Sequence, residues 1–184
     1  MSFRPFMKKG LTVLLCILML SGLGLATTYR ELTLDEMLAV TDLAFYGQVA
    51  DVTVEERSGE PWTVVTFEVL ESLFGTEDRL DEDGISLSLA FYGGTLSSGE
   101  TVTVSLMPQF AVGELVLVLA YDGEHYSPVV GFRQGLWRDG TLGLRDDTDR
   151  LLGFDDEDTV LLDGVGGDTD ALIASLRDAL EARP

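Results

Sequence analysis

The sequence predicts a mainly β domain with a helix at each end, folded as a small closed or partly open antiparallel barrel. Five or six short segments rich in β-branched and aromatic residues follow one another over residues 45–138, separated by glycine, proline and acidic turns. Segments with apolar residues at helical spacing flank this stretch on both sides. A β-sandwich is the alternative, but the strands are few for it and no Cys…Trp…Cys pattern is present.

The first elements are a helix and a strand. Apolar residues recur near helical spacing over residues 31–44, and Thr33 is a suitable N-cap that two acidic residues follow at 35 and 36. The next run, residues 45–56, alternates as a strand does, and Gly47 marks a bulge or a tight bend in it.

The second strand follows a turn at residues 57–61, so that the two strands form a hairpin. Its side chains divide between two faces because successive residues of a strand point to opposite sides. One face is predicted to be a wall of the core and the other to be half exposed, with Trp62 and Glu68 on it. The predicted core face holds Thr63, Val65, Phe67 and Val69.

The remaining strands are shorter. We expect strands at residues 85–94 and 101–106, and a fully buried strand at 115–121, where the apolar run is continuous. A hairpin turn at 122–125 then leads to a last pair of short strands over 126–138, broken by two glycines.

The C-terminal part combines acidic loops with a helix. Residues after 138 are predicted to be loop-rich, and no internal repeat or coiled coil is found. Asp168 can cap a final amphipathic helix, and arginines lie toward its C-terminal end, as the helix dipole favours. Its apolar face would hold Leu172, Ile173, Leu176 and Leu180.

Residues 1–26 have the pattern of a signal peptide. Basic residues precede an apolar run at 11–20, and small residues then stand at the positions required for cleavage before Thr27. The run is shorter than the ~20 residues needed to span a bilayer, although an uncleaved anchor is the alternative. Residues 27–184 are thus predicted to form a single exported domain, periplasmic or extracellular, with no membrane attachment after cleavage.

The charge of this domain is strongly negative. The only cysteine, Cys16, lies in the predicted signal, which excludes disulfides and catalytic thiols from residues 27–184. Nine arginines, no lysine and 32 acidic residues remain there, a formal charge of −23. Nucleic acid and anionic membranes are poor partners for such a surface.

The order of the segments resembles a group of exported bacterial proteins of unknown function. The resemblance rests on LTLDEMLAVTDLAFYGQV, TVVTFEVLESLFG, FYGG, PQFAVGELVLVLAY and YSPVVGFRQGLWR, and it covers residues 29–138 and the closing helix. It implies an OB-like barrel, distantly similar to the netrin-like module of tissue inhibitors of metalloproteinases. Those inhibitors clamp a protease zinc with an N-terminal cysteine. No residue at the predicted mature N-terminus, Thr27, can do the same.

Catalytic motifs are missing from the sequence, which predicts a protein that is not an enzyme. His125 is the single histidine, and no G-x-S-x-G, H-E-x-x-H, GxGxxG or GxxxxGK[ST] pattern occurs. Acidic pairs are too numerous for any one of them to indicate hydrolytic chemistry.

Calcium is the one possible cofactor, since loop carboxylates are its preferred ligands. The acidic loops of residues 146–158 are the first place to look, although the EF-hand pattern fails there. The candidate ligands are Asp147, Asp149, Asp155, Asp156 and Asp158.

The predicted function is binding of an unknown protein or peptide. Arg133, Trp137 and Trp62 are the candidate contact residues, because arginine and tryptophan anchor many interfaces. A structural role for the glycines and for Trp137 at the barrel end is the competing interpretation. Two functional alternatives stand beside this one: an acidic structural domain stabilised by calcium or salt, and an inhibitor of an exported protease, the latter by analogy of fold alone.

Overall fold

The computed structural model describes residues 30–82 and 84–183. The chain divides into two units, Met1–Arg30 and Glu31–Pro184, and every described helix and strand lies in the second. The predicted signal peptide lies outside the described residues. No helix within the described ranges is long and apolar enough to cross a membrane.

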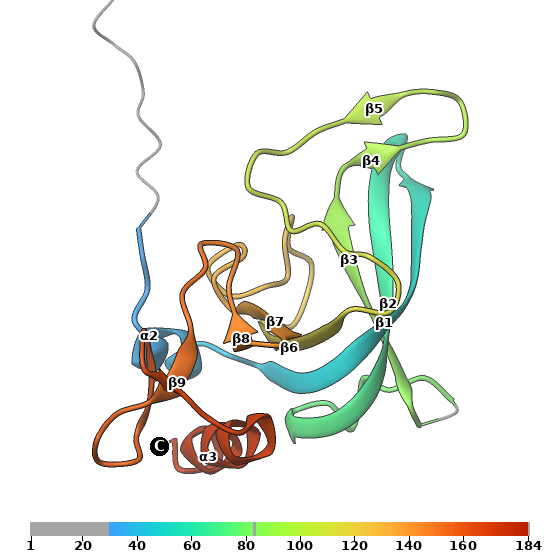
Figure 1. Ribbon diagram of the computed structural model, residues 1–184. Helices are drawn as coiled ribbons and strands as arrows, with labels where there is room; N and C mark the ends of the chain where they lie inside the picture. Colours follow the sequence, from blue (N-terminus) through green and yellow to red (C-terminus); the bar gives the residue numbers. More distant parts are fainter. Residues whose placement is uncertain (1–29, 83, 184) are drawn as a thin grey trace, which may run out of the picture. The chain divides into compact units, whose positions relative to one another are not determined.

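Strands dominate the described part of the chain, as the sequence predicts, and the long C-terminal helix is also confirmed (Figure 1). The elements in chain order are α2 (Leu34–Ala39), β1 (Leu43–Arg57), β2 (Glu60–Phe74), β3 (Ser86–Tyr92), β4 (Gly94–Thr95), β5 (Thr101–Val102), β6 (Leu115–Ala120), β7 (Leu136–Gly140), β8 (Gly143–Arg145), β9 (Leu152–Phe154), β10 (Val160–Leu162), β11 (Val165–Gly166) and α3 (Thr169–Glu181).

The main sheet is antiparallel, with the strand order β3-β2-β1-β6-β7-β8 over the described residues. The long hairpin of β1 and β2 forms its centre. The register between them shifts at three places, one of them between Tyr46 and Gly47. A side chain at Gly47 would come within 2.5 Å of the Glu68 carbonyl oxygen, so the predicted bulge is confirmed and needs glycine.

The sheet packs a hydrophobic core against each of its faces. β6 contributes to both, since Val116 and Val118 lie in one core and Leu117 and Leu119 in the other. Its continuous apolar run is thus explained by burial on two sides, as predicted. Val65 and Phe67 of β2 are fully buried, as predicted, while Thr63 and Val69 of the same predicted core wall are half-buried, Val69 against the same core.

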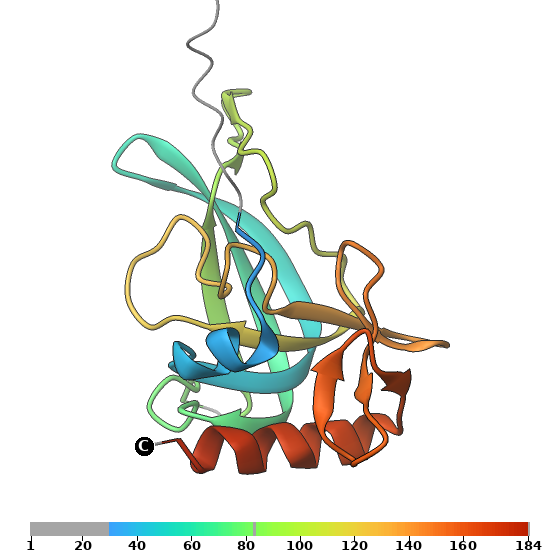
Figure 2. The ribbon, with the colours of Figure 1, turned by 90° about the vertical axis from the view of Figure 1, so that its left-hand side faces the viewer.

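The two helices cover one of these faces. α3 buries its four predicted apolar residues against this core, and Asp168 caps it by accepting a hydrogen bond from the Ala171 N–H at 3.2 Å. α2 is shorter than predicted, but Thr33 and Glu36 form a capping box at its start. Figure 2 shows α3 below the small C-terminal sheet and below the open end of the β1–β2 hairpin, where β2 ends.

The main sheet does not close into a barrel. Among the described residues no ladder joins the outer strands β3 and β8. Strands expected nearby are also shorter than predicted. β5 ends at Val102, and the chain turns away at Leu106, whose φ is +66°. Phe110 of the following segment then packs on Phe67 and Phe91, with ring centroids 5.6 and 4.9 Å apart.

The stretch from 126 to 138 is largely a turn rather than a pair of strands. Val129 makes an isolated bridge to Ala120, residues 130–135 form successive turns, and only β7 follows as a strand. Gly131 sits at φ +61°. A side chain at Gly135 would come within 2.8 Å of the Leu119 carbonyl oxygen. The two glycines therefore build a tight turn against β6.

The acidic region is more ordered than predicted. β9, β10 and β11 form a small antiparallel sheet. The turn before β9 and the turn after it have the same hydrogen-bond pattern. Asp146 and Asp155 each open such a turn, and the turns contain the similar sequences DDTDR and DDEDT. Asp149 and Asp158 occupy the same position at φ +68° and +59°. The sequence alone did not reveal this repeat, because each copy is only five residues long.

Candidate functional site

A groove of about 530 Å³ lies between the outer face of β2 and β3 and the loop of residues 121–128. The turn at residues 57–60 borders it as well. On this half of the main sheet one face packs in a core, and the two described helices, α2 and α3, pack in the other core rather than over the outer face of β2 and β3. The residues that line it include Trp62, Val64, Ser88, Ala90, Tyr121 and His125.

The loop that forms the far wall is attached at both ends. The Tyr121 N–H donates to the Pro128 carbonyl at 2.8 Å, which closes the loop on itself. The Tyr126 carbonyl accepts from the Tyr92 N–H, also at 2.8 Å, which ties the loop to the end of β3. The loop thus stands beside β3 without forming a strand on it (Figure 2).

Three aromatic rings meet beside the groove, and one of them, Trp62, lines it. Trp62 from β2 and Tyr92 from β3 meet edge to face at 5.3 Å, and Tyr126 from the loop lies 4.8 Å from Tyr92. The Trp62 and Tyr126 rings are nearly parallel, at an interplanar angle of 13° and 6.4 Å apart. Tyr126 is 63% exposed. We call Trp62, Tyr92 and Tyr126 the aromatic cluster.

Charged residues surround this aromatic cluster. The Arg57 guanidinium lies 5.8 Å from the centre of the Trp62 ring and pairs with Glu55 at 3.1 Å. Burial, together with a hydrogen bond to the Glu60 carboxylate, raises the pKa of the Tyr92 phenol. Arg79 pairs with Asp122 at the far side of the groove. The bordering arginines are therefore already matched by carboxylates of the same chain.

His125 lies on the groove loop with its side chain exposed. Its Nε2 is 3.1 Å from the Asp122 carbonyl oxygen, and its ring packs on Tyr121 with centroids 5.0 Å apart. Both contacts stay within the loop and hold the imidazole in place.

The three predicted contact residues do not come together. Trp62 lines the groove, but Arg133 lies in the turn after the loop and is not part of the lining. The Arg133 Nε is buried and has no hydrogen-bond partner among the described residues. Trp137 is fully buried, in register with Leu117 of β6. It has no surface to offer a partner, which corrects the prediction that it anchors an interface.

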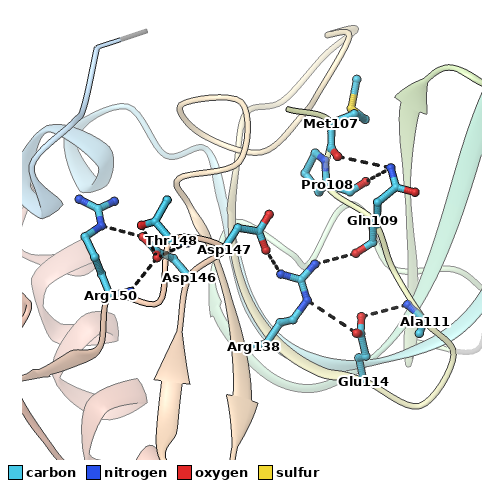
Figure 3. Close-up of polar contacts among 10 residues, drawn as sticks. All are labelled: Met107, Pro108, Gln109, Ala111, Glu114, Arg138, Asp146, Asp147, Thr148 and Arg150. Carbon is cyan, nitrogen blue, oxygen red and sulfur yellow. Dashed lines mark hydrogen bonds and ion pairs between the residues drawn. The ribbon is translucent and has the colours of Figure 1, made fainter. Parts of the chain in front are cut away.

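Three of the five candidate calcium ligands, Asp147, Asp149 and Asp155, make contacts within the chain. Asp147 pairs with Arg138, whose guanidinium also donates to the Gln109 carbonyl at 2.6 Å and lies 3.7 Å from Glu114 (Figure 3). Asp149 lies 3.3 Å from Arg145.

The second acidic turn is likewise closed by its own backbone. The Asp155 carboxylate accepts hydrogen bonds from the Glu157 and Thr159 N–H groups, both at 2.8 Å. Over residues 30–82 and 84–183, no three histidine, cysteine or acidic side chains are close enough together to hold a metal ion. The structure therefore does not gather Asp147, Asp149, Asp155, Asp156 and Asp158 into a site.

Calcium is accordingly expected to leave the stability of the domain unchanged. In the part of the chain that the structure describes, the carboxylates are dispersed, several are paired with arginine, and none of them form a multidentate site for a divalent ion. The measurement is the melting temperature of residues 27–184 in calcium and in chelator, at matched ionic strength. A rise specific to calcium, absent with magnesium, would contradict this expectation.

The comparisons with known proteins identify no relative. No family model matches the chain, and no curated protein matches it. The resemblance to exported bacterial proteins therefore stays a prediction.

Tyr92 and Tyr126 were not predicted as site residues. The alternation along the strand could have identified Tyr92, because Ser88, Ala90 and Tyr92 alternate with the buried Leu87, Leu89 and Phe91. This places Tyr92 on the outer face with Trp62. Tyr126 lies in a loop, and no local pattern fixes where a loop side chain packs.

Proposed function

We propose that this protein is a non-enzymatic binding module of the cell envelope or the extracellular space, and that its ligand is a protein or peptide. The groove beside β3 supports this most directly. It runs along an open face of the main sheet and reaches the aromatic cluster through Trp62, which lines it, while Tyr126 of that cluster is exposed beside it. Tyrosine and tryptophan supply large contact areas at low entropic cost and dominate the energetics of many interfaces.

The arrangement of the groove also fits an OB-like barrel that is left open. OB folds are partly open five-stranded barrels that bind ligands on the face of their second and third strands and on the neighbouring loops. In this chain the groove lies on β2 and β3, between the β1–β2 turn and the loop after β6. A nucleic-acid ligand, common for that fold, is disfavoured by the charge of −23 over residues 27–184.

Affinity capture with matched variants tests this proposal. Residues 27–184 are immobilised as wild type, as Tyr126→Ala and as Leu142→Ala, and exposed to the exported proteins of the source organism. Leu142 is a control because it is 72% exposed and belongs neither to the groove lining nor to the aromatic cluster. We expect a protein that is retained by wild type and by Leu142→Ala but lost with Tyr126→Ala.

The outcome also distinguishes kinds of partner. An exported protease among the groove-dependent proteins would favour an inhibitory role. Retention that is equal for all three proteins, or no retention at all, would contradict binding of a protein partner in the groove.

A further inference from the structure

The inner edge of β3 is fully used by β2. The ladder runs through the odd-numbered residues: the Val69 N–H donates to Ile85 O at 2.8 Å and the Gly93 N–H donates to Pro61 O at 2.9 Å. Because the backbone groups of successive strand residues point to opposite edges, the N–H and C=O groups of Leu87, Leu89 and Phe91 face β2.

The even-numbered residues of β3 present their backbone groups to the groove. At one end Ser86 O accepts from the Asp81 N–H, and at the other the Tyr92 N–H donates to Tyr126 O, both at 2.8 Å. Between them, the N–H and C=O groups of Ser88 and Ala90 have no hydrogen-bond partner among the described residues. Both residues line the groove. The groove therefore contains a short open strand edge with its two ends already closed.

We propose that an extended segment of a partner polypeptide adds to β3 as a further strand, pairing with Ser88 and Ala90 between β3 and the 121–128 loop. This inference rests on the proposed function and specifies its mode. An unpaired edge binds extended chains through main-chain hydrogen bonds, while the pockets beside it select every second side chain.

The side chains around this edge select a basic segment. An added strand would project alternate side chains to the outer face, beside Tyr92 and Tyr126, where aromatic faces attract a cation. Arg57 already makes such a contact with Trp62. Glu60 and Glu124 border the groove with carboxylates that no arginine of residues 30–82 or 84–183 pairs with, although Glu60 accepts a hydrogen bond from Tyr92, and residues 27–184 carry −23. A lysine or arginine at the outward position of the segment complements both features.

Selection from a randomised library of linear heptapeptides, on immobilised residues 27–184, tests the inference. The strongest peptide is then synthesised, and its affinity is measured for wild type, Ala90→Pro and Ala90→Ser. Proline at 90 removes an N–H that faces the groove and none that faces β2, so the ladder is preserved. Ala90→Ser keeps the N–H and serves as the matched control.

We expect selected peptides to carry lysine or arginine, and Ala90→Pro to weaken binding about tenfold or more while Ala90→Ser stays within about twofold. Since proline can also unfold a strand, the peptide itself supplies a second test. N-methylation of every second amide should abolish binding in one register and leave it nearly unchanged in the other.

Equal loss in both registers, or full binding to a folded Ala90→Pro variant, would overturn strand addition. If Tyr126→Ala still weakened binding of the same peptide, the result would support binding in the groove by a mode other than strand addition. Failure to select any peptide would also count against strand addition, while affinity capture would judge the groove separately. Association of residues 27–184 with itself, lost in Ala90→Pro, would replace the partner by a second copy of the chain.

Discussion

Trp137→Ala is expected to lower the free energy of unfolding by about 3–5 kcal/mol, the range for removing a large aromatic side chain from a core. Trp137 is fully buried in the core that β6 shares with the small C-terminal sheet and α3. The surrounding residues come from several elements, so they cannot collapse readily into the space left by the indole. Urea unfolding followed by circular dichroism measures the loss.

Trp137→Phe should cost far less, about 1 kcal/mol, because phenylalanine refills most of the space and removes a buried donor. The Trp137 Nε1 is buried and has no hydrogen-bond partner among the described residues. Leu142→Ala is the control, because that side chain is largely exposed and should change stability by less than about 0.5 kcal/mol. Equal losses for Trp137→Ala and Trp137→Phe would contradict the expectation that filling the space, rather than the indole N–H, carries most of the stability.

Asp146→Asn is expected to cost about 2–3 kcal/mol at neutral pH, because the carboxylate holds a turn through charge-assisted hydrogen bonds. Its side chain is only 3% exposed and pairs with the Arg150 Nε at 2.8 Å. The same carboxylate accepts from the backbone N–H groups of Thr148 and Arg150 (Figure 3). An amide retains one acceptor oxygen but loses the charge that faces Arg150.

The effect of this substitution should depend on pH. Burial alone would raise the pKa of Asp146, but the hydrogen bonds from Thr148 and Arg150 outweigh it and hold the pKa below its ordinary value. The stability that the carboxylate contributes is thus fully present above the ordinary pKa of about 3.9 and is lost as the pH falls through the folded-state pKa. The difference in urea midpoint between wild type and Asp146→Asn should therefore shrink below about pH 4.

Asp155→Asn is the matched control for this experiment. Asp155 opens the second turn of the same design and accepts the same pair of backbone hydrogen bonds, but it is exposed, and Thr159 stands where the first turn has Arg150. We expect a cost below about 1 kcal/mol and little change with pH. A cost equal to that of Asp146→Asn would mean that the turn geometry, and not the buried ion pair, stabilises the first turn.

Local pattern alone determined the elements whose residues repeat regularly over several turns or pleats. The apolar face of α3, the N-caps Thr33 and Asp168, the fully buried part of the β2 core wall and the buried run of β6 were all predicted correctly. In each case the spacing of apolar residues, or a capping side chain, is enough to predict the local structure. The bulge at Gly47 belongs here too, because an isolated glycine inside a strand usually marks a bulge or a close approach of another backbone.

Elements shorter than about four residues were beyond such reasoning. Three-residue strands such as β9 and β10 carry no measurable alternation, and the turns between them resemble any acidic loop. The same weakness allowed residues 101–106 and 126–138 to be taken for strands. Their local patterns are typical of strands, but contacts with neighbouring segments hold the backbone in turns instead. Gly135, for example, packs directly on β6.

Tertiary structure alone decided the candidate site. The sequence singled out Trp62, Arg133 and Trp137 as residue types that anchor interfaces, and the fold separates them: one lines the groove, one lies in a turn and one is buried. Composition determined that residues 27–184 carry a large negative charge and no thiol. The aromatic cluster and the open edge of β3 exist only because residues distant in sequence meet where the main sheet fails to close. No local pattern encodes that long-range pairing, since it depends on which strand edges remain unpaired once every other contact has formed.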